Sequence, residues 1–117
     1  MRNGEGLLMI VPSARTSPEP LIDELTRKMT AAWRNRDSSD YAYMGVHVCG
    51  CHARSDNKDH WVRCPSPNQE FHLTNSLCIH YLAFHRADVP QTELDKVRRL
   101  PYGEEEPDER ELAMPAR

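Results

Sequence analysis

The chain has 117 residues and a mass of 13.5 kDa, which allows one small domain and excludes a large multi-domain enzyme. Its net charge of −3 at pH 7 is too small for an acidic disordered protein, although Leu, Ile, Val and Phe make up only 21 of the 117 residues. The longest apolar run, residues 7–11, is shorter than a membrane span or the core of a secretory signal. We therefore expect a cytoplasmic protein. In that reducing compartment, cysteines bind metals more often than they form disulfides.

The first third of the chain predicts a loose arm followed by one helix. Residues 1–17 hold Gly, Pro, Ser and Thr around the apolar run and predict a loose N-terminal arm or one edge strand. A helix is expected to begin at Ser17, which can cap it, with Pro18 at the first helical position. Apolar residues then recur every three or four positions and predict a stripe that faces a core: Leu21, Ile22, Leu25, Met29, Ala32 and Trp33.

The middle of the chain predicts a β-hairpin over residues 44–64. Val46 and Val48 favour extended backbone, residues 55–59 are a strong turn signal, and residues 60–64 form a second short strand. A loop is expected at 65–68. Residues 74–76 then open a second helix, which ends before Pro90, and residues 91–100 form a third helical segment.

The last residues are expected to lie outside the fold. Residues 101–117 carry six acidic side chains against two arginines and predict an acidic disordered tail. The folded part is then a single zinc-stabilised domain, residues 18–100, of the α+β class, with a short β-hairpin packed on two or three helices. Domains of this size have small hydrophobic cores and often gain stability from a bound metal.

The strongest chemical signal is a crowd of metal-ligand side chains. All ten cysteines and histidines lie within residues 47–85, where an even spread would place about three. On an extended strand, Cys49 and Cys51 point to one face, and Gly50 between them leaves amides free to hydrogen-bond the sulfurs. His80 and His85 have the spacing of zinc-finger histidines, provided that the last helical turn loosens. The spacing predicts a tetrahedral zinc site made of Cys49, Cys51, His80 and His85.

Other cysteines and histidines remain reserve candidates for this site. His47 shares the predicted strand face with the cysteine pair, Cys64 ends the opposing strand and His72 precedes the second helix. Cys78 fits a buried core thiol better, because it lies within an apolar helical pattern. His52, His60 and His72 are expected to be ordinary surface or loop histidines. Disulfides to Cys64 or Cys78 stay open only in an oxidising compartment.

The predicted function is a small cytoplasmic binding or adaptor module with a structural zinc and a protein partner. Catalysis is not expected, because the H-E-x-x-H signature is absent and the candidate bases lie in turns or loops: Asp56, Asp59 and Glu70. Two alternatives stay open. One is a zinc-dependent hydrolase with an open coordination position. The other is a nucleic-acid-binding zinc module that uses small basic patches at residues 33–36 and 96–99.

Overall fold

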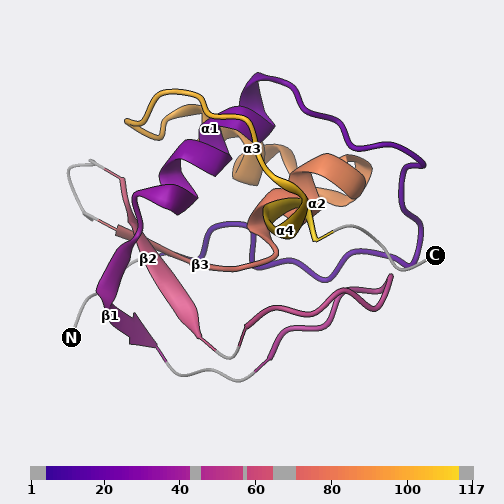
Figure 1. The fold of residues 1–117 in the computed structure, drawn as a ribbon, viewed down its shortest axis with the longest axis horizontal. Helices are drawn as coiled ribbons and strands as arrows, with labels where there is room; N and C mark the ends of the chain where they lie inside the picture. Colours follow the sequence, from indigo (N-terminus) through magenta and orange to yellow (C-terminus); the bar gives the residue numbers. More distant parts are fainter. Residues whose placement is uncertain (1–4, 43–45, 57, 65–70, 114–117) are drawn as a thin grey trace.

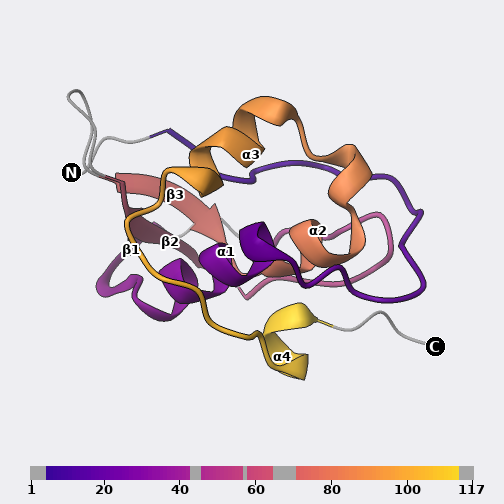
Figure 2. The same ribbon diagram turned by 90° about the horizontal axis from the view of Figure 1, so that it is seen from above.

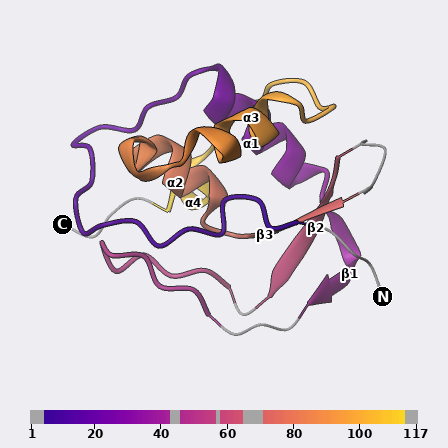
Figure 3. The same ribbon diagram turned by 180° about the vertical axis from the view of Figure 1, so that it is seen from behind.

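The computed structural model describes residues 5–42, 46–56, 58–64 and 71–113 and confirms the predicted α+β class (Figure 1). Over these ranges an antiparallel sheet has the strand order β1-β2-β3, with β1 at Asp37–Ala42, β2 at Asp59–Arg63 and β3 at Phe71–Asn75. The helices gather on one side of this sheet (Figure 3). They are α1 (Glu24–Arg34), α2 (Cys78–Phe84), the 3₁₀ helix η1 (Arg86–Asp88), α3 (Gln91–Arg98) and α4 (Glu109–Leu112).

The sheet differs from the predicted hairpin in which segments it pairs. β2 pairs with β1 on one side and with β3 on the other. The segment around Val48, which the hairpin prediction used as the first strand, instead forms a separate loop closed by one bridge between Val48 and Arg54. β3 was not predicted, because Thr74 and Asn75 resemble the start of a helix. Residue 44, residue 57 and the predicted loop at 65–68 lie outside the described residues.

Helix α1 begins later than predicted, at Glu24 rather than after Ser17. Asp23 is its N-cap and accepts a 3.1 Å hydrogen bond from the Thr26 amide. The amides of Ser17 and Leu21 bond instead to the carbonyls at the end of α2, so this segment is not helical. A second proline, Pro20, disfavours helical backbone at the residue before it. The apolar stripe is correct from Leu25 onward, and four of its members are buried: Leu25, Met29, Ala32 and Trp33.

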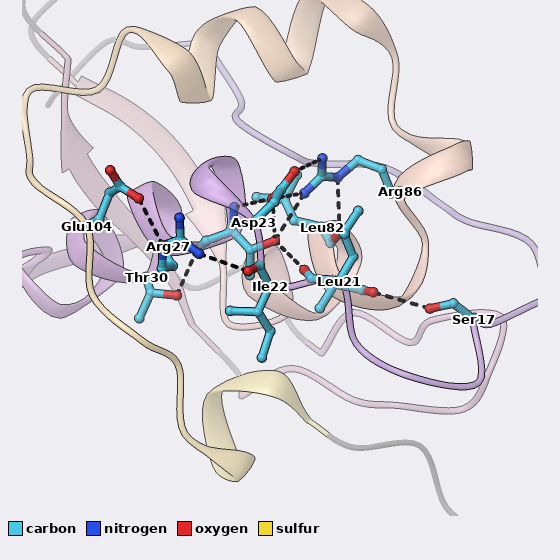
Figure 4. A network of polar contacts seen from close by, with 11 residues as sticks. Ser17, Leu21, Ile22, Asp23, Arg27, Thr30, Leu82, Arg86 and Glu104 are labelled. Carbon is cyan, nitrogen blue, oxygen red and sulfur yellow. Dashed lines mark hydrogen bonds and ion pairs between the residues drawn. The ribbon is translucent and has the colours of Figure 1, made fainter.

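A polar network joins the start of α1 to the end of α2, beside His85. Both terminal nitrogens of Arg86 donate to the Asp23 carboxylate, at 2.8 and 2.6 Å, and Arg86 Nε donates to the Leu82 carbonyl at 3.1 Å (Figure 4). These hydrogen bonds hold the pKa of Asp23 at about 2, below its usual value of 3.8. The charge at Asp23 therefore helps to fix α2, and with it His85, against α1.

We expect Asp23→Asn, which keeps a capping side chain but removes the charge, to lower the free energy of unfolding by about 1 kcal/mol near neutral pH. The folded pKa of Asp23 lies below the unfolded one, so the stabilisation is complete above about pH 4 and disappears as the pH falls towards 2. Urea denaturation of both proteins should show the difference closing over that interval. A difference that does not change with pH would contradict the ion-pair assignment.

The N-terminal segment packs against the domain instead of hanging free. Leu7 and Leu8 are completely buried, and the backbone at Leu7 and Glu5 exchanges hydrogen bonds with Leu73 of β3, at 2.8 and 3.0 Å. The Thr74 hydroxyl adds a 2.7 Å bond to the Leu7 carbonyl. Burying two leucine side chains stabilises the fold by about 3–6 kcal/mol, by the usual transfer free energies, and this offsets much of the entropy lost when the segment is ordered.

The described part of the expected tail also packs on the domain. Asp108 and Glu111 form a capping box at α4, and Leu112 is buried. Arg34 of α1 donates to Glu111 at 2.6 and 2.9 Å and to Glu105 at 3.1 Å. Two of the acidic residues that suggested a disordered tail are thus ion-pair partners of Arg34 at the end of α1. Figure 2 shows α4 on the side of the molecule opposite α3.

Helix α2 is the centre of the core. All seven of its residues are buried, and α1 and α4 both contact it. A helix that is surrounded on every side in this way can carry a histidine into the interior only if that side chain finds partners there.

No helix in the described part of the chain is both long enough and apolar enough to cross a membrane.

Candidate metal centre

The four residues that the sequence singled out as zinc ligands come together in the structure. The sulfurs of Cys49 and Cys51 and one ring nitrogen each of His80 and His85 all lie within 4.8 Å of one another. Cys49 Sγ is 3.1 Å from His85 Nε2, and Cys51 Sγ is 3.2 Å from His80 Nε2. Around a tetrahedral zinc ion, neighbouring sulfur and nitrogen ligands are separated by about 3.3–3.8 Å, given the usual bond lengths. The two measured sulfur–nitrogen distances are slightly shorter than this range and the widest span of the cluster is longer, so small side-chain shifts would bring the four atoms to a tetrahedral shell.

The cysteine pair is carried by a tight turn, not by the extended strand that the sequence suggested. The Cys49 amide bonds to the Ala53 carbonyl at 2.8 Å, and the His52 amide bonds to the Cys49 carbonyl at 2.9 Å. His52 has a φ of 75°, a left-handed conformation that closes the turn. The turn brings both sulfurs to the same side of the loop, as the strand prediction required, by a different backbone path.

Gly50 is required here because another part of the chain approaches its Cα. A Cβ at this position would lie 2.6 Å from the Ser13 carbonyl carbon and 2.7 Å from the Pro12 oxygen. The 46–56 loop and the N-terminal segment lie side by side at the end of the molecule away from the sheet (Figures 1 and 3). The sequence could not show this contact, which joins residues far apart in the chain.

We expect Gly50→Ala to lower the free energy of unfolding by about 1–3 kcal/mol, because the new methyl group would overlap backbone atoms that cannot rotate away. The same change should weaken metal binding, since the backbone shift displaces both neighbouring cysteines. Chemical denaturation and a metal competition assay measure the two effects. Gly103→Ala is a matched control, because no atom lies within 4 Å of a Cβ there. Equal behaviour of the two variants would contradict the prediction.

His80 is oriented for metal binding by a backbone group. Its side chain is completely buried, and Nδ1 lies 3.0 Å from the Leu112 carbonyl at the end of α4. A carbonyl can only accept, so Nδ1 carries the proton and Nε2 turns its lone pair towards Cys51. Leu112 is a functional residue that the sequence analysis missed. Its contribution is a main-chain oxygen, which leaves no signal in the side-chain pattern.

His85 lies just beyond the end of α2, so the helix ends earlier than the predicted end before Pro90, although the loosened backbone expected at His85 is present. The helix ends at Phe84, and His85 has a φ of −129° and a ψ of 31°. On a continuous helix the two histidines would diverge, and the loosened end turns both rings towards the cysteine loop, with centroids 5.0 Å apart. Nδ1 of His85 is 3.9 Å from the Asp88 carboxylate, which itself accepts hydrogen bonds from Ser13.

Burial sets the protonation of the cluster. It raises the pKa of Cys49 to about 11, although the amides of Cys51 and Gly50 act in the opposite direction. It also lowers the pKa of His80 and of His85. Near neutral pH both imidazoles are therefore neutral and able to act as ligands, whereas a metal ion has to displace the thiol proton.

The reserve candidates lie outside this cluster. His47 Nε2 bonds to the buried Asp59 carboxylate at 2.8 Å, and His72 is a buried residue of β3. Cys64 and Cys78 are free thiols in the core, and burial raises the pKa of Cys78 to about 12. Two of the histidines expected at the surface are buried: His72, and His60, whose ring packs edge-on against Trp33 with centroids 5.0 Å apart.

The donor set is all nitrogen and sulfur. Over the described ranges no carboxylate joins the four ligands, and the candidate bases have other partners, since Asp56 contacts His60 and Asp59 contacts His47. Glu70 lies outside the described residues.

No family model matches this chain, and comparisons with curated proteins and with solved structures likewise give no match. The chemistry of the cluster therefore has to be argued from its geometry.

Proposed function

We propose that this chain is a small binding module stabilised by a structural zinc ion, which Cys49, Cys51, His80 and His85 hold. One observation carries the proposal: two thiols and two imidazoles from distant parts of the chain converge within the span of one coordination shell. Two sulfur and two nitrogen donors in a tetrahedral arrangement suit zinc, whereas magnesium, calcium and manganese prefer oxygen ligands.

A closed site favours a structural role for the ion over a catalytic one. Structural zinc has four protein ligands, whereas catalytic zinc keeps one position for water or substrate. Here four protein donors are available, and three of the ligand residues are buried, with only Cys51 partly exposed. A hydrolase would also require a nearby base, and the described acidic side chains near the loop are engaged in hydrogen bonds. These features support a binding module rather than the hydrolase alternative.

The ion would fix several segments that have little regular structure of their own. The cysteines belong to the 46–56 loop, which contacts the N-terminal segment at Gly50. His80 belongs to α2 and His85 directly follows it, and the His80 ring contacts the Leu112 carbonyl of α4. Metal binding would thus determine the shape of the surface made by the loop and the C-terminal segment, where we expect a partner to bind.

Cobalt substitution tests the proposal directly. Metal analysis of the purified chain should give one zinc per chain, and Co²⁺ exchanged into the site should show the intense visible bands of tetrahedral cobalt and a sulfur-to-cobalt charge-transfer band. Cys51→Ser should lose part of the charge-transfer intensity, whereas Cys64→Ser should keep it. The weak spectrum of octahedral cobalt, or an equal loss in both variants, would contradict the proposed ligand set.

A further inference from the structure

A cavity of about 320 Å³ lies between the end of α1, the 46–56 loop and α4. That volume is at the lower end of the range found for small-molecule sites. Its walls come from segments far apart in the chain, namely residues 33–36, 54–56, 76–77 and 110–113. None of the four proposed metal ligands lines it, so the cavity is separate from the metal centre.

Three arginines line this cavity: Arg36, Arg54 and Arg110. Arg36 lies over the Trp33 ring, 4.1 Å from its centroid, and donates to the Trp33 carbonyl at 2.9 Å. Its Nε is buried and has no hydrogen-bond partner. Arg54 and Arg110 are exposed, and neither makes an ion pair with another described residue. None of these three guanidinium charges is offset by an ion pair with a described residue, and such charges at the wall of a cavity favour a bound anion.

Two acidic residues, Asp56 and Glu111, also line the cavity, but only Asp56 sets its charge against the three arginines, because Glu111 is paired with Arg34. Asp56 accepts from His60 Nε2 at 3.1 Å and from the Lys58 amide at 3.2 Å. Glu111 accepts from Arg34 at 2.6 and 2.9 Å and from the Asp108 amide at 3.0 Å. The cavity is therefore positively charged on the side that the arginines form.

The remaining wall is mostly apolar. Trp33 and Ala113 line it together with Ser76, and Leu77, which also contributes to the lining, is completely buried. A ligand that suits both sides has a compact anionic group attached to an apolar or aromatic body. Guanidinium groups form paired hydrogen bonds with phosphate oxygens, and a dianion gains more than a carboxylate from three positive charges.

We propose that this cavity binds a phosphate monoester carried on an apolar or aromatic group. The phosphate contacts Arg36, Arg54 and Arg110, and the organic group lies against Trp33 and Ala113. This proposal names a class of ligand for the binding module. It rests on the proposed function in one respect only, because the zinc ion would hold the segments that carry two of the arginines. Arg54 lies on the loop that carries the cysteines, and Arg110 lies close to Leu112, whose carbonyl faces His80.

Calorimetric titration of the purified protein, with its zinc content measured, tests this site. The probes are phenyl phosphate, inorganic phosphate and benzoate in a buffer free of phosphate. Phenyl phosphate should bind one to one with a Kd below about 1 mM, at least about tenfold tighter than the other two probes. Arg54→Gln and Arg110→Gln should each weaken it about tenfold or more. Both side chains are exposed, so these variants should fold.

Arg99→Gln is the matched control, since it removes the same charge from an exposed position outside the cavity and should leave the affinity unchanged. Absence of saturable binding up to about 10 mM, or equal weakening by Arg99→Gln, would overturn the proposal. So would inorganic phosphate or benzoate that binds as tightly as phenyl phosphate. Tighter binding of a thymidine oligonucleotide, with a steep dependence on salt, would assign the cavity to nucleic acid instead.

The metal measurement separates this proposal from the proposed function. If the protein and its arginine variants all contain zinc but none binds phenyl phosphate, the cavity assignment fails and the zinc assignment stands. If phenyl phosphate binds to protein that contains no zinc and takes none up, the cavity assignment stands and the metal assignment fails.

Discussion

Excess EDTA should unfold most of this domain and lower its melting temperature by tens of degrees. Structural zinc contributes an apparent binding free energy of about 10 kcal/mol or more, and small domains have total stabilities of about 5–15 kcal/mol. Without the ion, Cys49 and Cys51 are held to His80 and His85 only by sulfur–nitrogen hydrogen bonds, each worth about 1 kcal/mol. Besides these bonds, the loop is held near α2 by the Asp56 amide, which donates to the Ser76 hydroxyl at 2.8 Å, and by the packing of Cys49 in the core, contacts that are weak beside a bound zinc ion.

Circular dichroism and tryptophan fluorescence measure the effect. We expect the loss of structure on removal of the metal to spread from the loop to α4, because the Leu112 carbonyl faces His80. It should also reach the N-terminal segment, because that segment lies against Gly50. Added Zn²⁺ should restore the original melting curve, and EDTA already saturated with zinc should have no effect. A melting curve unchanged in excess EDTA would exclude a structural metal.

The sequence alone was sufficient for the parts of the site that depend on local chemistry. The cysteine pair and the two histidines stand out by spacing, and the need for a loosened helix end at His85 follows from helix geometry and is found in the structure. The predicted extended strand at Cys49 was wrong. Two cysteines separated by one residue can place their sulfurs on the same side either in an extended strand or in the turn that the structure shows.

The missed features depend on contacts between distant segments. Thr74 and Asn75 have the residue types of a helix start, and only pairing with β2 and the bond from Thr74 to Leu7 show that they form a strand. The acidic composition of the tail predicted disorder, but its residues Glu104, Glu105 and Glu111 form ion pairs with arginines of α1. Local sequence propensities cannot predict these contacts, because the residue types within one segment do not indicate which distant segment it will pack against.

Cys49→Ser should abolish stoichiometric zinc binding, and this is the sharpest test of which residues hold the ion. A serine hydroxyl does not ionise near neutral pH and is a poor ligand for zinc. We expect the affinity to fall by more than about 100-fold, the upper range for the loss of a second-shell partner alone. Because Cys49 is buried, the new hydroxyl also costs about 1–3 kcal/mol that has no connection with metal.

Cys64→Ser separates the two contributions, since Cys64 is also a buried thiol of the core but lies outside the cluster. Both variants bear the cost of a buried hydroxyl, and only Cys49→Ser should lose the ion. EDTA should therefore lower the melting temperature of the wild-type chain and of Cys64→Ser. Cys49→Ser should already resemble the EDTA-treated wild-type chain, and EDTA should not change its circular dichroism further. If Cys49→Ser keeps one zinc per chain and remains sensitive to EDTA, Cys49 is not a ligand, and another donor has to complete the shell around Cys51, His80 and His85.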